Sequence, residues 1–230
     1  MLRKKAGERQ IYYQSEYEEQ NSKQRLGLFA LQKQLQVLRL KEILVMAGFV
    51  SAAAFGRVLM QWLPSVEPLT FFAMLSGWLF GRKKGFAVGA SSLYLSNFFV
   101  YGGQGPWTIF QALGFGIAGF AGGFLRKKAT IFGCLIMAAI ATLSFEIIVN
   151  FGSLVFLPSS IFTIFFLALP FSIVHLASNL AFSVFLPWLR RYVERTGRFN
   201  EKEICMELLH KMKNFRQNNP ADKNLNIQKR

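Results

Sequence analysis

The chain has 230 residues, 52% of them hydrophobic, with 25 Phe and a formal net charge of +15. This composition is too apolar for an ordinary soluble domain and indicates extensive contact with lipid. Only nine of the 39 charged residues (27 basic and 12 acidic) lie between positions 43 and 189. The basic residues therefore mark membrane orientation rather than nucleic-acid binding, and no segment resembles a recognition helix or an RNA-binding sheet.

Residues 1–42 are expected to form a cytoplasmic extension. Residues 1–25 are charged and rich in Gln and Tyr, which predicts disorder, and they lack the apolar core of a secretory signal peptide. Residues 26–41 are predicted to form a juxtamembrane amphipathic helix at the cytoplasmic surface. The face of this helix is expected to be exposed to solvent, and the alternative is that it docks on a partner subunit. Its leucines recur near helical spacing at Leu28, Leu31, Leu35, Leu38 and Leu40.

Six apolar runs follow, and each is expected to be a transmembrane helix. The runs are roughly Ile43–Leu63, Leu69–Phe80, Gly85–Tyr101, Pro106–Leu125, Ala129–Phe151 and Ser160–Leu189. A spanning helix needs about 20 residues, so the last run is too long for one straight helix. We expect Pro170 to separate an outer piece from a main helix that runs to Pro187-Trp188.

Basic clusters alternate with loops that contain no Lys or Arg. Basic residues precede the first run, follow the last, and separate the second from the third and the fourth from the fifth. The loops near 64–68, 102–105 and 152–159 are bare. By the positive-inside rule, this pattern predicts an all-α, polytopic protein of the cell membrane with six transmembrane helices and cytoplasmic N- and C-termini. Residues 43–189 would form the transmembrane domain, and residues 190–230 a basic cytoplasmic tail.

This orientation gathers polar side chains from five helices in the outer half of the bilayer. Ionisable groups in a bilayer are costly and usually face a cavity or a partner, so a wet pocket open to the outside is predicted. Its polar residues would be Arg57, Gln61, Asn97, Gln111, Glu146 and Asn150, with His175 and Asn179 at middle depth and with Trp62, Trp107 and Phe98 as aromatic walls.

Structural roles are the alternative for several of these residues. Arg57 and Glu146 would then pair with each other and hold two helices together. His175 would be a packed, hydrogen-bonded histidine, and Asn97 and Asn179 would make interhelical hydrogen bonds of modest energy.

A turn of Gly102-Gly103-Gln104-Gly105-Pro106 joins the third and fourth runs. Pro106 fits the first turn of the next helix, and Trp107 suits a membrane interface. Gln104, Trp107 and Gln111 surround a helix entry whose N–H groups are unpaired, which makes them strong candidates for solute contact.

Small residues recur every four positions in the first run, at Gly48, Ala52 and Gly56. Such faces allow close helix packing, either within the protein or with another membrane protein. In the fourth run, Gly119, Gly122 and Gly123 are expected to pack internally.

Several sites are absent from the sequence. There is no phosphate-binding loop for ATP, and only two histidines and no Cys/His cluster, so neither a nucleotide site, a cofactor nor a metal site is predicted. Cys134 and Cys205 are expected to lie apart and unbridged. Ser91 with His175 is a weak hydrolase pattern that lacks the usual following Gly, so no catalytic residues are expected and the chain is predicted not to be an enzyme.

The pattern resembles the substrate-binding S component of energy-coupling factor (ECF) vitamin transporters over roughly residues 43–190. The similarity is carried mainly by Ser96-Asn97-Phe98-Phe99 and Gly103-Gln104-Gly105-Pro106-Trp107-Thr108, continued by Gln111-Ala112-Leu113-Gly114. The segments Gly56-Arg57, Glu67-Pro68-Leu69-Thr70 and Gly81-Arg82 match as well.

The resemblance implies a six-helix subunit that captures a vitamin or vitamin precursor from outside and works with a membrane T subunit and two cytoplasmic ATPases. Gly48, Ala52 and Gly56 would stand where the family has its Ala-x-x-x-Ala contact with the T subunit. The alternatives are a stand-alone carrier or channel and a membrane assembly protein. The sequence does not select a vitamin: cobalamin, thiamine-like or pyrimidine precursors and queuosine precursors all fit.

Overall fold

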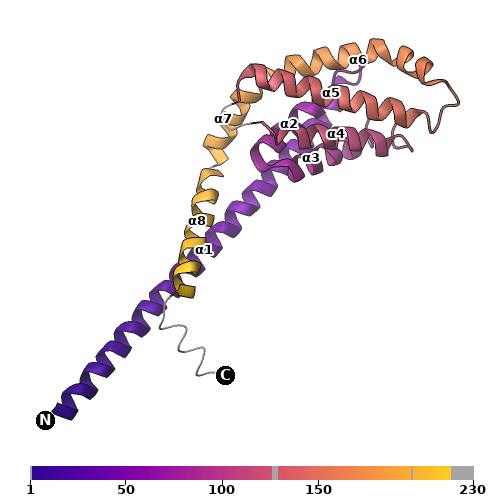
Figure 1. The fold of residues 1–230 in the computed structure, drawn as a ribbon. Helices are drawn as coiled ribbons and strands as arrows, with labels where there is room; N and C mark the ends of the chain where they lie inside the picture. The colour runs from indigo at the N-terminus through magenta and orange to yellow at the C-terminus, as the bar shows by residue number, and fades with distance from the viewer. Residues whose placement is uncertain (1, 126–128, 198, 219–230) are drawn as a thin grey trace. The chain divides into compact units, whose positions relative to one another are not determined.

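The computed structural model describes residues 2–125, 129–197 and 199–218, which contain helices and no strand (Figure 1). The prediction of an all-helical chain is confirmed. Two compact units are described separately: one holds the chain up to Lys41 together with the last helix, and the other runs from Glu42 to Gly197. The helices are α1 (Leu2–Met60), α2 (Leu69–Phe80), α3 (Arg82–Ser96), α4 (Thr108–Gly122), α5 (Ile131–Ser153), α6 (Ile161–Ser183), α7 (Leu186–Gly197) and α8 (Phe199–Asn218).

The first helix is uninterrupted from Leu2 to Met60, so the predicted disorder of residues 1–25 is wrong for residues 2–25. Residues 2–25 are helical rather than disordered, and no break separates residues 26–41 from the first apolar run. The composition explains this result, because residues 2–25 contain no Pro and many Glu, Gln, Lys and Arg, which favour a helix.

The amphipathic face of residues 26–41 packs on α8 and is not solvated. Leu38 is buried with Cys205 and Leu209, and three of the other repeating leucines, Leu28, Leu31 and Leu35, pack against them. The Cys205 thiol donates to the Leu31 carbonyl at 3.3 Å. Both cysteines are free thiols.

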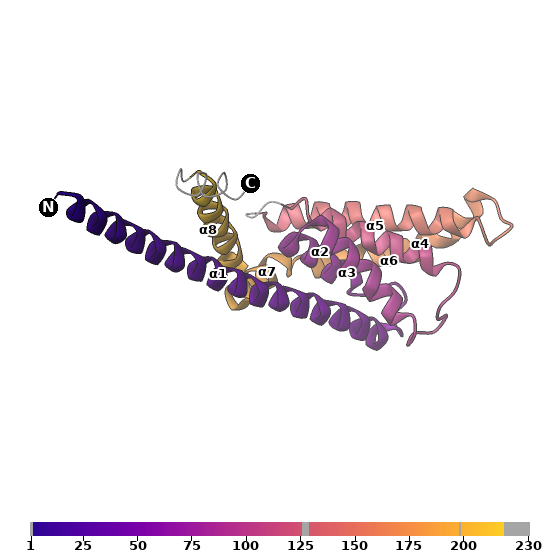
Figure 2. The same ribbon diagram turned by 90° about the horizontal axis from the view of Figure 1, so that it is seen from below.

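Three short helices, α2, α3 and α4, pack backbone against backbone (Figure 2). A Cβ atom at Gly119 would lie 2.0 Å from the Gly85 carbonyl oxygen, and one at Gly77 would lie 1.9 Å from the Gly119 oxygen. A Cβ at Gly89 would meet the Phe115 oxygen at 2.1 Å. Since no side chain fits at these points, the glycines set the helix spacing, and the predicted internal packing of the fourth run is confirmed.

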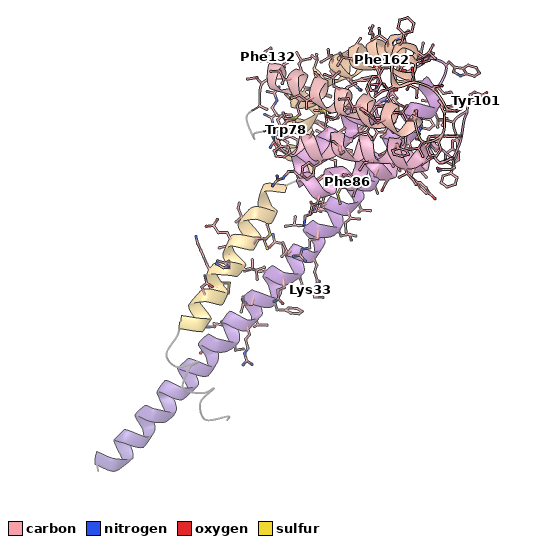
Figure 3. All side chains as sticks on the ribbon, turned by 45° about the vertical axis from the view of Figure 1, so that its right-hand side comes forward. Lys33, Trp78, Phe86, Tyr101, Phe132 and Phe162 are labelled. Atoms are coloured by element: carbon pink, nitrogen blue, oxygen red, sulfur yellow. The ribbon has the colours of Figure 1, made fainter. Side chains whose placement is uncertain are left out.

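In the part of the chain that the structure describes, three helices are long and apolar enough to cross a membrane: α1 between Arg25 and Met60, α5, and α6. The apolar helices α2 and α4 are shorter. Much of the apolar surface of the long helices points away from the protein, as Phe132 (70% exposed) and Phe162 (83% exposed) do in Figure 3. Exposed apolar surface of this extent on helices of spanning length indicates a membrane protein.

The last apolar run breaks at a different point from the one predicted. The helix α6 continues through Pro170 to Ser183, and the chain leaves helical structure at Val184-Phe185 before α7 begins at Leu186. A proline is tolerated inside an apolar helix when neighbouring groups and local adjustments compensate for the lost hydrogen bond. Pro187 instead occupies the first turn of α7, where the missing N–H has no cost.

Candidate functional site

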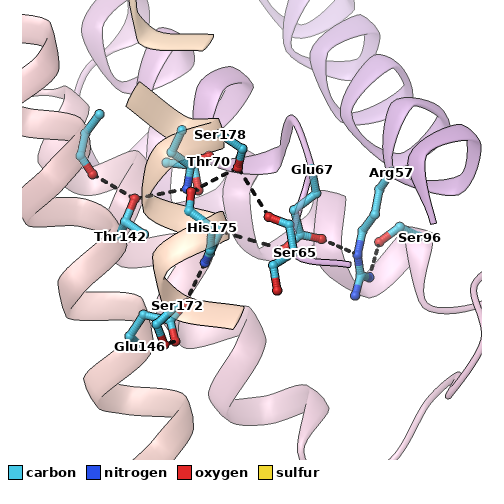
Figure 4. A network of polar contacts seen from close by, with 12 residues as sticks. Arg57, Ser65, Glu67, Thr70, Ser96, Thr142, Glu146, Ser172, His175 and Ser178 are labelled. Atoms are coloured by element: carbon cyan, nitrogen blue, oxygen red, sulfur yellow. Dashed lines mark hydrogen bonds and ion pairs between the residues drawn. The ribbon is translucent and has the colours of Figure 1, made fainter. Parts of the chain in front are cut away.

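Arg57, in the last turn of α1, ties that helix to the next loop and to α3 (Figure 4). Its Nε lies 2.6 Å from Glu67 Oε2. Its Nη1 donates to Ser96 Oγ at 2.8 Å and to Asn97 Oδ1 at 2.5 Å. Both members of the Arg57–Glu67 pair are mostly buried, with side chains 16% and 14% exposed. A buried ion pair is stable only with such additional hydrogen bonds.

Glu67 is placed by the loop between α1 and α2. This loop contains Ser65, whose φ of 59° is unusual for a residue other than glycine. Ser178 Oγ of α6 donates to the Ser65 carbonyl at 3.2 Å. A Cβ at Gly56 would lie 2.7 Å from Pro68 Cγ, so α1 and the start of α2 meet closely. The loop is therefore held between α1 and α6, and the second oxygen of Glu67 faces α6.

His175 of α6 lies behind Glu67, and its side chain is 3% exposed. Its Nε2 lies 3.9 Å from Glu67 Oε1 and has no hydrogen-bond partner among the described residues. Its Nδ1 lies 2.6 Å from Glu146 Oε1 of α5, and Glu146 Oε2 accepts from Ser172 Oγ at 2.6 Å. The rings of Phe145 and Phe115 stand edge-on to the imidazole, at centroid distances of 5.0 and 6.3 Å.

Arg57, Glu67, His175 and Glu146 with their hydrogen-bond partners are called the polar network below. It links the four helices α1, α3, α5 and α6 and the α1–α2 loop. The alternative in which Arg57 pairs with Glu146 is wrong, because each has a different partner.

The α3–α4 connection extends the polar network towards α4. Asn97 Nδ2 donates to Thr108 Oγ1 at 3.2 Å and to Gln111 Oε1 at 3.5 Å. Thr108 Oγ1 also accepts from the Gly105 N–H at 3.1 Å. The hydroxyl of Thr108 thus joins the glycine-rich turn to Asn97, which accepts a hydrogen bond from Arg57.

Asn179 lies one turn further along α6 than His175 and is 2% exposed. Its Nδ2 donates to Thr142 Oγ1 at 2.9 Å and to Thr70 Oγ1 at 3.2 Å, joining α6 to α5 and α2. This geometry is that of an interhelical hydrogen bond, the structural alternative for this residue.

The other predicted site residues lie outside the polar network. Gln104 Nε2 donates to the Tyr94 carbonyl at 2.8 Å, and Trp62 is 74% exposed with its ring edge-on to Tyr101 at 6.0 Å. Trp107 is 43% exposed. Asn150 is buried in α5, without a hydrogen bond to the network among the described side chains. Gln104, Trp62 and Trp107 are therefore exposed side chains outside the polar network.

A pocket of about 160 Å³ opens at the Arg57–Glu67 end of the polar network. Of the residues predicted to line the outer pocket, Arg57 and Gln61 line it. Glu67 and Tyr101 were not predicted as contacts. Its lining residues are Arg57, Met60, Gln61, Leu63, Pro64, Ser65, Val66, Glu67, Val100 and Tyr101.

Glu67 is the main residue that the sequence reasoning missed. A signal was present, because Glu67 and Glu146 are the only acidic residues between positions 43 and 189 and the loop around Glu67 contains no basic residue. A charge in such a place needs a partner, and Arg57 is ten residues away in the sequence.

A comparison with protein families gives one match: residues 38–196 match the model of DUF6580, described as a family of unknown function. Searches of curated proteins and of solved structures give no match.

Proposed function

Because the chain belongs to DUF6580, a family of unknown function, we propose its function from the site: it captures a small organic solute, as the S component of an ECF-type importer does. The solute would be a vitamin or vitamin precursor that enters the Arg57–Glu67 pocket from outside the cell. The observation that carries this proposal is the polar network, which places two carboxylates, a guanidinium and an imidazole among apolar helices and opens into a pocket at one end.

Helix length supports a pocket below the outer membrane surface. In the proposed six-helix topology, α2 rises from the cytoplasmic side, marked by Arg82 and Lys83, and its 12 residues span only about 18 Å. The hydrocarbon core is about 30 Å thick, so the end of the α1–α2 loop that enters α2 would lie roughly 10 Å inside it. Irregular backbone at that depth is stable only where protein buries it or where it lines a water-filled cavity.

Aromatic residues support the same placement. The part of α1 from Lys41 to Met60 has a length of about 28 Å, close to the hydrocarbon thickness. Exposed Trp62 and Tyr101 stand beyond its outer end, and exposed Trp188 and Tyr192 follow the last spanning helix. Tyr and Trp concentrate at both membrane–water interfaces, as this arrangement requires.

The pocket has the chemistry to orient a polar heterocycle. Glu67 offers a carboxylate, Arg57 a guanidinium and Tyr101 an aromatic wall, and specific sites combine a few such polar groups with apolar walls. The volume of about 160 Å³ is below the roughly 300–1,000 Å³ of drug-sized ligand sites. Solute binding would therefore displace the α1–α2 loop, in which the left-handed Ser65 marks the kind of strained backbone found at ligand clamps.

Coupling to partner proteins follows from the lack of a nucleotide site. Gly48 has no atom within 4 Å of its potential Cβ, and Ala52 is exposed on the same side of α1. These two residues would contact the T subunit, and two ATPases would drive transport. Gly56 packs against Pro68 inside the protein, so the contact surface would be centred on Gly48 and Ala52.

Mass spectrometry of small molecules retained by the detergent-purified protein tests the proposal. We expect one organic compound to accompany the wild-type protein and the Lys83→Gln control, and to be lost from Arg57→Gln and Glu67→Gln. Retention of the same compound by all four proteins would contradict binding in this pocket.

Purification from membranes that contain the transport machinery tests the assembly separately. We expect the chain to bring down a T subunit and two ATPases. Isolation without them, while the solute is still bound, would instead indicate a stand-alone carrier.

A further inference from the structure

One face of α7 combines exposed aromatic rings with exposed cations. Trp188 and Tyr192 are 61% and 57% exposed, and their rings stack at a centroid distance of 6.1 Å and an interplanar angle of 14°. Arg191 and Arg195 are also exposed. Positions 188, 191, 192 and 195 follow the spacing of one helical face, so the four side chains form a single surface, called the α7 face below.

The opposite side of α7 fixes this helix to the bundle. Leu186 is fully buried, and Leu189 and Val193 pack against the core that contains it. Arg190 is 5% exposed, lies 4.3 Å from the centre of the Trp78 ring, and donates to Glu194 from Nη2 at 2.7 Å. The α7 face therefore has a defined position in the unit from Glu42 to Gly197.

Acidic side chains near this end of the bundle already have cationic partners. Glu194 is paired with Arg190, and Glu42 is paired with Lys84 at 2.5 Å. Arg82, which begins α3, is exposed and lies over the rings of Phe120 and Phe124 at 5.6 and 4.9 Å. Among the described side chains, the surface charge that remains here is cationic, which suits an anionic ligand.

The α7 face also continues the apolar surface that faces lipid. Val184 and Phe185, which connect α6 to α7, are 43% and 60% exposed. Phe166 and Ile173, further back on α6, are 76% and 59% exposed. An anion that reaches the arginines of α7 would thus lie beside aromatic rings and at the end of a lipid-covered helix, which is the environment of a phospholipid headgroup.

We propose that the α7 face binds the phosphate of an anionic phospholipid in the cytoplasmic leaflet. Arg191 and Arg195 hold the phosphate, while Trp188 and Tyr192 pack along the glycerol and upper acyl region. This interaction anchors α7 at the interface independently of any solute bound in the Arg57–Glu67 pocket.

Quenching by brominated lipid tests the inference in a full-length chain whose other tryptophans are replaced by Phe, leaving Trp188. The protein is reconstituted in phosphatidylcholine vesicles that contain a small, equal fraction of either acyl-brominated phosphatidylglycerol or acyl-brominated phosphatidylcholine. We expect the anionic lipid to quench several-fold more strongly, since each Arg near an anionic surface favours binding by about fivefold. With the double substitution Arg191→Gln and Arg195→Gln, the two brominated lipids should quench Trp188 equally.

The control carries the same charge change elsewhere, with Arg25→Gln and Lys33→Gln on α1, and should keep the preference. Equal quenching by both lipids in the unsubstituted reporter would overturn the proposal, as would a preference that survives the double α7 substitution. Loss of the preference on adding inorganic phosphate would assign the site to free phosphate. The same comparison with all four tryptophans present covers the case in which the Phe substitutions prevent folding.

Discussion

Among the residues, Glu67 is the link between Arg57 of α1 and His175 of α6. One oxygen pairs with Arg57, and the other faces the buried His175 at 3.9 Å. His175 is in turn bonded to Glu146. A solute that displaced water near Glu67 would therefore be sensed on α1, α5 and α6 through direct contacts.

Removing either member of the Arg57–Glu67 pair should leave the other mostly buried and uncompensated. We expect Arg57→Gln and Glu67→Gln each to destabilise the protein by about 1–3 kcal/mol, below the value for a fully buried pair because both groups keep some exposure. The double variant should be less destabilised than the sum of the two, with a coupling of about 1 kcal/mol or more. Thermal unfolding in detergent of the wild type, the two single variants and the double variant measures this coupling. If the two single effects simply add in the double variant, Arg57 and Glu67 are not coupled.

The hydrogen bond between Asn179 and Thr142 should contribute modestly to stability. Thr142→Val keeps the side-chain shape but removes the acceptor, so a loss of about 0.6–1.7 kcal/mol is expected for an interhelical bond. Ser144→Ala is the control, because Ser144 bonds only to the Ile140 carbonyl of its own helix among the described residues. If both variants unfold at the same temperature, Asn179 does not join α5 to α6 in this way.

Sequence reasoning selected several members of the polar network but not their pairing. Arg57, Asn97, Glu146 and His175 stand out because charged or amide side chains are rare in apolar runs. Their partners depend on the fold of the α1–α2 loop. Whether Glu67 or Glu146 faces Arg57 depends on helix rotation and loop path, and neither can be read from spacing.

Among the elements, the glycines of α2, α3 and α4 set the geometry on which the site rests. Gly119→Ala should destabilise the protein by several kcal/mol, because its Cβ would lie 2.0 Å from a backbone oxygen that cannot move alone. Gly48→Ala is the matched control. It meets nothing within 4 Å and should gain up to about 1 kcal/mol of helix propensity. Similar unfolding temperatures for the two variants would contradict the close packing of α3 on α4.

The elements were more predictable than their boundaries. The apolar run Leu69–Phe80 coincides with α2, since Pro68 and Gly81 flank it. The third helix begins and ends earlier than the predicted run Gly85–Tyr101. Arg82 starts α3, although the basic cluster suggested a loop. The expectation that proline interrupts a helix is wrong at Pro170, because a long apolar helix tolerates a proline where neighbouring groups compensate for the lost hydrogen bond.

At the scale of the whole molecule, the proposed importer needs an open helix face for its partner. Gly48→Leu should not lower the unfolding temperature, because the position is open, but should abolish co-purification of the T subunit. Ala30→Leu, also at an exposed position of α1, is the control and should keep the partner. Retention of the T subunit by Gly48→Leu would place the contact elsewhere.

Accessibility of the pocket in intact cells tests the central claim most directly. Leu63→Cys places a thiol in the pocket lining, whereas the natural Cys134 and Cys205 are buried. We predict that a membrane-impermeant thiol reagent labels this cysteine from outside, and that the solute recovered from the purified protein slows the labelling. Labelling that requires permeabilised cells, or that the solute leaves unchanged, would contradict capture of an external solute in this pocket.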